Sequence, residues 1–170
     1  MSDRPAQRAY LSLGSNIEPE RNLPAAVRAL EAFGRVVAVS GVWESAPFES
    51  SGNNFLNAAV LLETELSAAR IYHEAIPGIE QQLGRVRDPH DKNAPRTIDV
   101  DLSLFNHDVL ELAGHRIPDP DVVKRPFVAV PLAELDRDYM HPTLGRTLAD
   151  IAASWTTHSG LRPRPDVRLR

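Results

Sequence analysis

The stretch TIDVDLSLF, residues 97–105, decides the fold class. Every second residue from Ile98 to Leu104 is apolar, and Asp99 and Asp101 take positions between them. This period of two predicts a β-strand that buries its apolar face against helices and turns both carboxylates to the opposite face. Because Asp is depleted in strand interiors, two acids in mid-strand need an explanation.

Three strands and two helices precede this strand. We expect the strands at Ala9–Leu13, Arg35–Trp43 and Phe55–Thr64. Asn22 is expected to cap the first helix, which ends at Gly34, and Ser67 caps the second, where Pro77-Gly78 predicts a kink or a break. The order βαββαβ predicts an α+β, ferredoxin-like fold, with an antiparallel sheet and both helices on one face. The other face is then free for ligands.

The rest of the chain shows a looser pattern. A short amphipathic piece is expected near Phe127–Leu135, and a last helix at Leu148–Ala153. The final ten residues, LRPRPDVRLR, hold four Arg and two Pro and are typical of a solvated tail. We therefore expect one domain over residues 8–155, with flexible ends at 1–7 and 156–170.

Composition excludes several classes of protein. The 170 residues carry a net charge of −4, which argues against sequence-independent binding of nucleic acid. Cysteine is absent, and this removes disulfides, thiolate nucleophiles and zinc–cysteine sites. The start lacks the layout of a signal peptide, and no apolar run is long enough for a membrane span. We expect a cytoplasmic monomer that has small molecules as its partners.

The carboxylate pair is the strongest chemical signal. Asp99 and Asp101 on one strand face would hold Mg²⁺ against substrate phosphates, and a divalent cation would relieve their mutual repulsion. Basic residues precede the pair, at Arg85, Arg87, Lys92 and Arg96, and guanidinium groups match phosphate oxygens. Alternatively, the acids are simply the polar side of a solvent-facing strand. The first two arginines could likewise interact only with the dipole of their own helix.

A second constellation is aromatic. Phe55 and Asn57 share a strand face, so a flat heterocycle could stack on the ring while the amide pairs with its edge. Phe127 follows a Lys-Arg-Pro run farther along the chain. The alternative is that both phenylalanines belong to the core.

These motifs together resemble the 6-hydroxymethyl-7,8-dihydropterin pyrophosphokinase family, whose fold is ferredoxin-like. The resemblance rests on YLSLGSN from Tyr10, FLNAAVLLET from Phe55, IEQQLGRVR…APRTIDVDLSLF from Ile79 and RPFVAVPLAEL from Arg125. It implies transfer of the terminal pyrophosphate of ATP to the hydroxymethyl group of the pterin, with release of AMP. By resemblance, Asp99 and Asp101 hold two Mg²⁺ ions, and Arg85 and Arg96 act on the phosphates.

The resemblance also assigns binding residues. On the pterin side the matching residues are Ser45, Phe55, Asn57 and Phe127; on the ATP side they are Glu80, Arg87, Lys92 and Arg125. Some positions depart from the family pattern, chiefly in loops on the ATP side: Ser50–Asn53, Pro77-Gly78, Asn93-Ala94 and Asp119, which stands where relatives carry His. These departures keep open a divergent pterin-binding homologue with altered use of ATP or another acceptor alcohol. A ferredoxin-like interaction domain without chemistry is the third hypothesis.

Overall fold

The computed structural model describes residues 6–47, 52–91, 94–155 and 160–170. The strands are β1 (Gln7–Ser15), β2 (Arg35–Val39), β3 (Trp43–Ser45), β4 (Phe55–Thr64), β5 (Asp99–Phe105), β6 (Leu110–Leu112), β7 (His115–Ile117) and β8 (Arg162–Pro163). The helices are α1 (Pro19–Leu30), α2 (Ala68–Arg70), a π-helical turn (Ile71–Ala75), α3 (Ile76–Gln82), α4 (Asp121–Lys124), α5 (Pro126–Leu135) and α6 (Leu148–Ala153). No helix in the part of the chain that the structure describes is long and apolar enough to cross a membrane.

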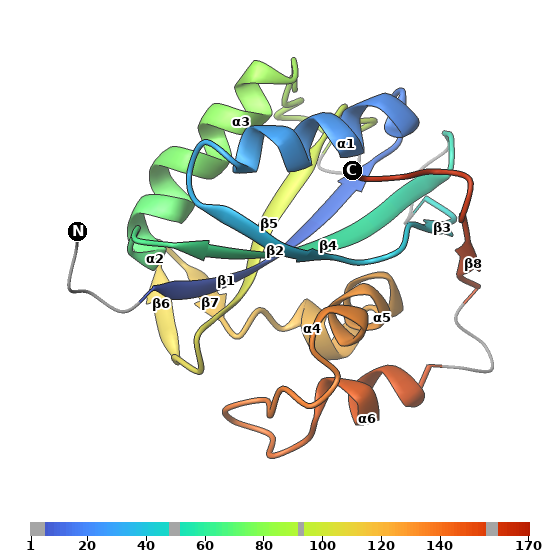
Figure 1. Ribbon diagram of the computed structural model, residues 1–170. Coiled ribbons are helices and arrows are strands. Elements are labelled where there is room, and N and C mark those ends of the chain that lie inside the picture. Colours follow the sequence, from blue (N-terminus) through green and yellow to red (C-terminus); the bar gives the residue numbers. More distant parts are fainter. Residues whose placement is uncertain (1–5, 48–51, 92–93, 156–159) are drawn as a thin grey trace.

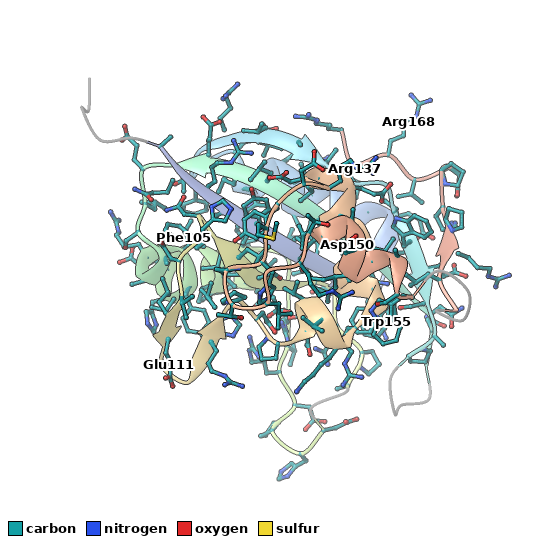
Figure 2. All side chains as sticks on the ribbon, turned by 90° about the horizontal axis from the view of Figure 1, so that it is seen from below. Phe105, Glu111, Arg137, Asp150, Trp155 and Arg168 are labelled. Atoms are coloured by element: carbon teal, nitrogen blue, oxygen red, sulfur yellow. The ribbon has the colours of Figure 1, made fainter. Side chains whose placement is uncertain are left out.

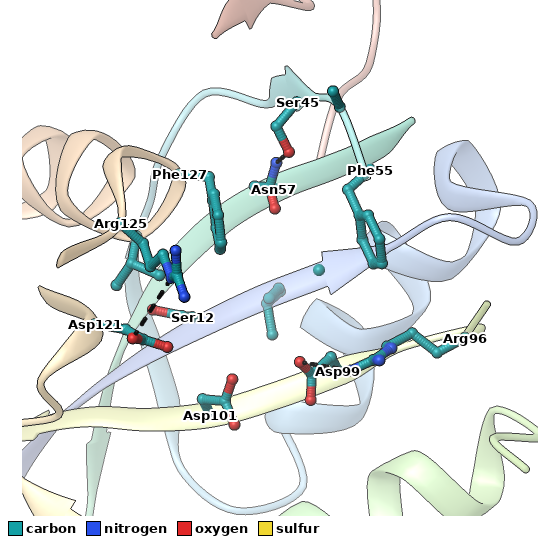
Figure 3. A pocket seen from close by; sticks show the side chains of 14 residues that line it. Ser12, Ser45, Phe55, Asn57, Arg96, Asp99, Asp101, Asp121, Arg125 and Phe127 are labelled. Atoms are coloured by element: carbon teal, nitrogen blue, oxygen red, sulfur yellow. Dashed lines mark hydrogen bonds and ion pairs between the residues drawn. The ribbon is translucent and has the colours of Figure 1, made fainter. Parts of the chain in front are cut away.

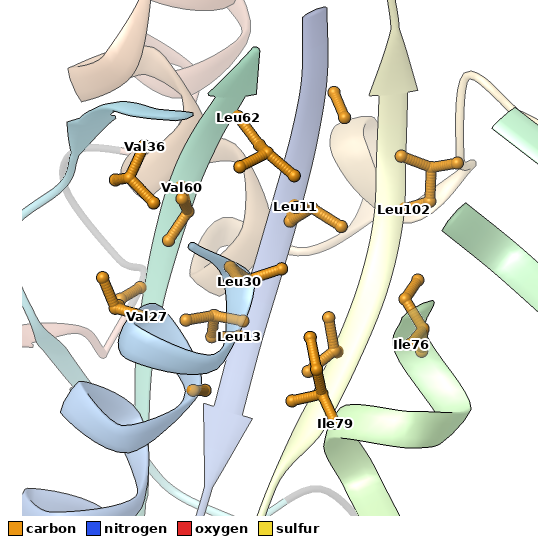
Figure 4. Packing of buried hydrophobic residues seen from close by; sticks show 14 of the residues in the cluster. Leu11, Leu13, Val27, Leu30, Val36, Val60, Leu62, Ile76, Ile79 and Leu102 are labelled. Carbon is orange, nitrogen blue, oxygen red and sulfur yellow. The ribbon is translucent and has the colours of Figure 1, made fainter. Parts of the chain in front are cut away.

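The main sheet is antiparallel, with strand order β5-β1-β4-β3-β8, and β2 also pairs with β4. Helices α1 and α3 cover one face (Figure 1). The main core forms between them and the sheet, where Leu11, Val60 and Leu102 pack against Val27 and Ile79 (Figure 4). The predicted α+β, ferredoxin-like architecture is confirmed.

The opposite face of the sheet is only partly free, unlike the prediction. Helices α4, α5 and α6 lie below it (Figure 1), and α5 packs on β4 and β1. A second apolar cluster forms there around Tyr10, Leu61 and Leu132. Leu104 belongs to this cluster and not to the main core, because a register shift between β1 and β5 at Tyr10/Leu11 turns it to the other face.

Several predicted boundaries are wrong. β1 extends two residues beyond each end of the expected range 9–13, and α1 ends at Leu30, before Gly34. Helix α1 begins at Pro19, after Glu18 in the left-handed conformation, and Asn22 lies inside it, where its side chain donates to Ile17 O at 2.6 Å. The strand expected over Arg35–Trp43 is divided into β2 and β3. The division lies at Ser40, whose Oγ accepts the Ala59 N–H at 2.8 Å in place of a backbone carbonyl.

The second helix confirms its cap and explains its kink. The Ser67 side chain accepts the Arg70 N–H, as predicted. Pro77 has no N–H to donate, and its ring would crowd the carbonyl of His73 in a regular α-helix. The widened π-turn at Ile71–Ala75 precedes it, with the Ile76 N–H bonded to Ile71 O, and the helix continues to Gln82.

The last ten residues do not form a solvated tail. β8 pairs with β3 at the edge of the sheet, and the chain then runs toward α1 (Figure 1). Leu169 is only 4% exposed and belongs to the main core, with Val167 packed beside it. The four arginines suggested full solvation, but two aliphatic side chains suffice to anchor this segment.

Candidate active site

The register of three strands builds the floor of a pocket. Gly14 on β1 pairs with Asn57 on β4 and with Asp99 on β5, so these residues form a row across the sheet. A Cβ at Gly14 would lie 3.7 Å from Asn57 Oδ1 and 3.8 Å from a ring carbon of Phe55. The missing side chain therefore leaves a hollow between the amide and the carboxylate.

This hollow is a pocket of about 310 Å³ on the face that α5 only partly covers (Figure 3). It brings together eight of the side chains singled out from the sequence: Ser45, Phe55, Asn57, Arg96, Asp99, Asp101, Arg125 and Phe127. Three of the other residues that line it were not singled out from the sequence: Ser12, Gly14 and Asp121. A glycine inside an apolar strand is a signal of close approach, but the strand was expected to end at Leu13, one residue before Gly14.

Phe55 and Phe127 lie on opposite sides of the pocket, with Asn57 between them (Figure 3). Both rings are partly exposed, so they form part of the pocket wall and do not belong to the core alone. The Asn57 amide donates to Ser45 Oγ at 2.8 Å and to Trp43 O at 3.1 Å. Both donors are thus used inside the protein, and Oδ1 is left as an acceptor near the cavity.

Asp99 is held by two arginines. Arg85, with 9% of its side chain exposed, donates to Asp99 Oδ1 at 2.9 Å, and Arg96 lies 3.5 Å from Oδ2. The guanidinium carbon of Arg96 also lies over the ring of Phe55, 5.9 Å from the ring centroid. Arg85 does not line the first pocket, so it supports the carboxylate from behind, whereas Arg96 faces the cavity.

The surroundings of Asp101 disfavour its ionised form. Solvent reaches its carboxylate, but the surrounding protein displaces bulk water, which raises its pKa well above the usual value. The charges of Asp99, Asp119 and Glu80 raise this pKa further, and Arg85 lowers it. A bound cation would favour the ionised form. The described parts of the chain contain no group of three His, Cys, Asp or Glu residues placed to hold a metal ion.

Glu80 on α3 connects the helix to this strand. It is buried, and its carboxylate accepts the Val100 N–H at 3.0 Å together with the guanidinium groups of Arg85 and Arg87. Every oxygen of the buried acid thus has a cationic partner. Glu80 therefore also fixes α3 against β5.

A second pocket of about 350 Å³ lies on the other side of the carboxylates. Asp99 and Asp101 line both pockets, so the pair forms their common border. Glu80 and Arg87 also line the second pocket, with Tyr72 and His115, whose rings stack at 5.1 Å. Neither aromatic residue was singled out from the sequence. Two cavities that share a carboxylate pair suit a reaction between two ligands.

Asp119, which stands where the family carries His, is engaged inside the protein. Its Oδ1 accepts the Asp121 N–H at 2.8 Å, and its Oδ2 lies 3.9 Å from His115 Nε2. Burial raises its pKa, and it does not line either of the two pockets. Four residues named above, Ser50, Ser51, Lys92 and Asn93, lie outside the described residues.

Comparison with known proteins identifies the family. The model of the family described as 7,8-dihydro-6-hydroxymethylpterin-pyrophosphokinase (HPPK) matches residues 10–137. The chain belongs to this family. The predicted resemblance and the predicted class of enzyme, a pyrophosphokinase, are confirmed.

Relatives that match along most of their length support the same family. The 2-amino-4-hydroxy-6-hydroxymethyldihydropteridine pyrophosphokinase of Pseudomonas aeruginosa is 37% identical over 87% of this chain and 91% of its own length. The protein of that name from Bacillus subtilis is 38% identical over 90% of this chain and 93% of its own. A crystal structure of Plasmodium falciparum HPPK-DHPS superimposes with a TM-score of 0.71 at 14% identity, covering 92% of this chain and 44% of the longer one. That likeness supports the fold alone.

Proposed function

We propose that this HPPK-family enzyme transfers the terminal pyrophosphate of ATP to the hydroxymethyl group of 6-hydroxymethyl-7,8-dihydropterin, a step of folate biosynthesis. The observation that carries the proposal is the shared border: Asp99 and Asp101 line both pockets. The pterin would occupy the first pocket and ATP the second. We further expect a cytoplasmic monomer with no nucleic-acid or membrane partner.

The pterin side has a matching chemistry. A planar heterocycle between Phe55 and Phe127 would gain stacking on both faces. The free Oδ1 of Asn57 would accept an N–H from the pterin edge, and Ser45 holds that amide in orientation.

At the carboxylate pair, where the two pockets meet, the hydroxymethyl oxygen of the pterin attacks the β-phosphorus of ATP. The bond from that phosphorus to the oxygen bridging to the α-phosphorus breaks, AMP leaves with this oxygen, and the hydroxyl proton is released to solvent. When bound, Mg²⁺ neutralises phosphate charge, and Asp99 and Asp101 would hold the two ions expected. Arg96 faces the reacting groups directly, and Arg85 acts on the phosphates through the orientation of Asp99.

The remaining predicted residues divide between the two ligands. Glu80 and Arg87 line the second pocket and would contact ATP there. The resemblance assigns Lys92 to ATP as well, and this residue lies outside the described residues. Arg125 lies beside Phe127 and Asp121 in the first pocket, so its guanidinium would approach the transferred group from the acceptor side (Figure 3).

The test mixes the protein with ATP, MgCl₂ and the pterin, and follows AMP and the pterin pyrophosphate. We expect AMP only when the pterin and Mg²⁺ are both present, and none after chelation with EDTA. A second candidate is a pterin-binding homologue with altered use of ATP or another acceptor alcohol, which the departure at Asp119, near the carboxylates, favours. Saturable pterin binding without AMP would support it, and no binding would overturn both.

A further inference from the structure

Segment 160–170 pairs with β3, a strand in the wall of the pterin-side pocket. β8 pairs with β3 in the register Trp43↔Pro163 and Glu44↔Arg162, and the Arg164 N–H donates to Val42 O at 2.8 Å. This segment lies beyond residue 137, where the match to the family model ends. β3 itself has only three residues and carries Ser45, the partner of Asn57.

A single carboxylate connects this segment to the pocket. Arg164 Nη1 donates to Glu44 Oε1 at 2.8 Å, and Glu44 Oε2 lies 3.4 Å from the amide nitrogen of Asn54. Glu44 directly precedes Ser45, and Asn54 directly precedes Phe55. The Arg164–Glu44 contact therefore reaches the backbone next to two residues of the pocket wall.

The opposite face of β3 is held by α5. Trp43 Nε1 donates to Glu134 Oε1 at 2.6 Å, and α5 also carries Phe127. With Trp43 tied on one face and Glu44 on the other, both faces of the strand are fixed before any ligand binds. Such preorganisation lowers the entropic cost of binding and of holding a substrate in line.

We propose that Arg164 is a positioning residue for the pterin subsite: through Glu44 it fixes β3, and thereby the Ser45–Asn57 pair and the start of β4 at Phe55. The inference rests on the proposed function for the identity of the ligand. Arg164 touches no substrate, so its effect falls on the pterin and not on ATP.

The experiment compares Arg164→Ala, Arg164→Lys and Glu44→Gln with the wild type. Both KM and Kd for the pterin should rise about fivefold in Arg164→Ala, while the KM for ATP and kcat at saturation stay within about twofold. Glu44→Gln, which disturbs the same contact from its other end, should act in the same direction. Arg164→Lys keeps the charge and should recover part of the pterin affinity.

Two matched controls separate this contact from general effects of the segment. Asp166→Asn removes the other short ion pair of Arg164, at 2.9 Å, and leaves Glu44 in place. Arg168→Ala removes an exposed arginine of the same segment that extends away from the fold (Figure 2). Both should keep wild-type pterin affinity.

Unchanged pterin Kd in Arg164→Ala and Glu44→Gln, or an equal rise in the KM for ATP, would overturn the inference. A thermal melt of each variant ensures that affinity is measured on folded protein. If the wild type binds pterin but releases no AMP, only the proposed transfer fails, and the comparison of Kd values still decides the role of Arg164. If the wild type binds no pterin, both proposals fail.

Discussion

Arg85 donates a hydrogen bond of 2.9 Å to Asp99 Oδ1 from beneath the floor of the pocket, and the same nitrogen bonds buried Glu80. The orientation of Asp99 is thus set from inside the protein. Arg85→Ala would leave Glu80 without a main cationic partner, and we expect the free energy of unfolding to fall by about 3 kcal/mol. Urea denaturation measures this loss.

The matched control is Arg70→Ala, which breaks an exposed ion pair with Glu74 on the same helical segment. Such a pair contributes about 0.5 kcal/mol. Equal losses in the two variants would contradict a structural role for Arg85.

Substitution of Asp101 should affect activity without lowering stability. Because the surrounding protein and the neighbouring acids disfavour its ionised form, Asp101→Asn should leave the metal-free protein at least as stable as the wild type. Transfer should be lost, together with the rise in melting temperature on addition of Mg²⁺. Asp138→Asn, at a side chain 91% exposed, is the control and should keep both. Near-normal turnover in Asp101→Asn would exclude the metal assignment.

Phe127→Ala tests the aromatic wall. The variant should bind pterin more weakly by at most about 3 kcal/mol, the range expected for one ring's stacking and burial. Fluorescence titration measures the affinity, and the KM for ATP should not change. Phe33→Ala removes a ring near the far end of β4 and should leave pterin affinity intact. An unaltered affinity in Phe127→Ala removes this residue from the site.

Gly14→Ala adds a methyl group to the floor of the pocket. Its Cβ would meet no atom closer than 3.7 Å, so the free energy of unfolding should change by less than about 1 kcal/mol. Pterin affinity should fall about tenfold, because the hollow between Asn57 and Asp99 is filled. In contrast, a Cβ at Gly34 would lie 2.2 Å from Glu63 O, and Gly34→Ala should destabilise the fold. Calorimetric titration and a thermal melt distinguish the two effects.

The burial of His141 predicts that the free energy of unfolding depends on pH. Its side chain is 5% exposed, Nδ1 lies 3.3 Å from the N–H groups of Thr143 and Leu144, and burial lowers its pKa. As the pH falls, this histidine is protonated in the unfolded chain at a higher pH than in the folded protein. The free energy of unfolding therefore has its full value above the usual pKa of 6.5 and decreases as the pH drops through that value. His141→Asn keeps an acceptor that cannot titrate, so urea denaturation between pH 7 and 5 should show a smaller loss. His90→Asn, at an exposed site, should not reduce the loss.

Sequence patterns predicted the elements whose apolar residues repeat regularly. β4 matches the expected range, and β5 begins within two residues of it. The hairpin of β6 and β7 was missed because its turn is Ala113-Gly114, with φ of 50° and 87°, and lacks the Asn-Gly or Asp-Gly pair that marks such turns.

The site was predictable where residue type alone carries the chemistry. Asp99 was identified because acids are unusual in strand interiors. Phe55 and Asn57 were identified because an aromatic ring and an amide share one strand face. Gly14 acquires its importance only from the register that places it between Asn57 and Asp99, which no local pattern encodes. The role of segment 160–170 likewise depends on a long-range strand pairing.

The pairing of β8 with β3 has a consequence for the molecule's behaviour in crowded solution. An uncovered outer strand presents unpaired N–H and C=O groups that invite other chains to add to the sheet. β8 covers part of that edge, and Pro163 brings no N–H of its own to template a further strand. The segment that orders the pocket wall thus also shields this edge of the sheet from aggregation.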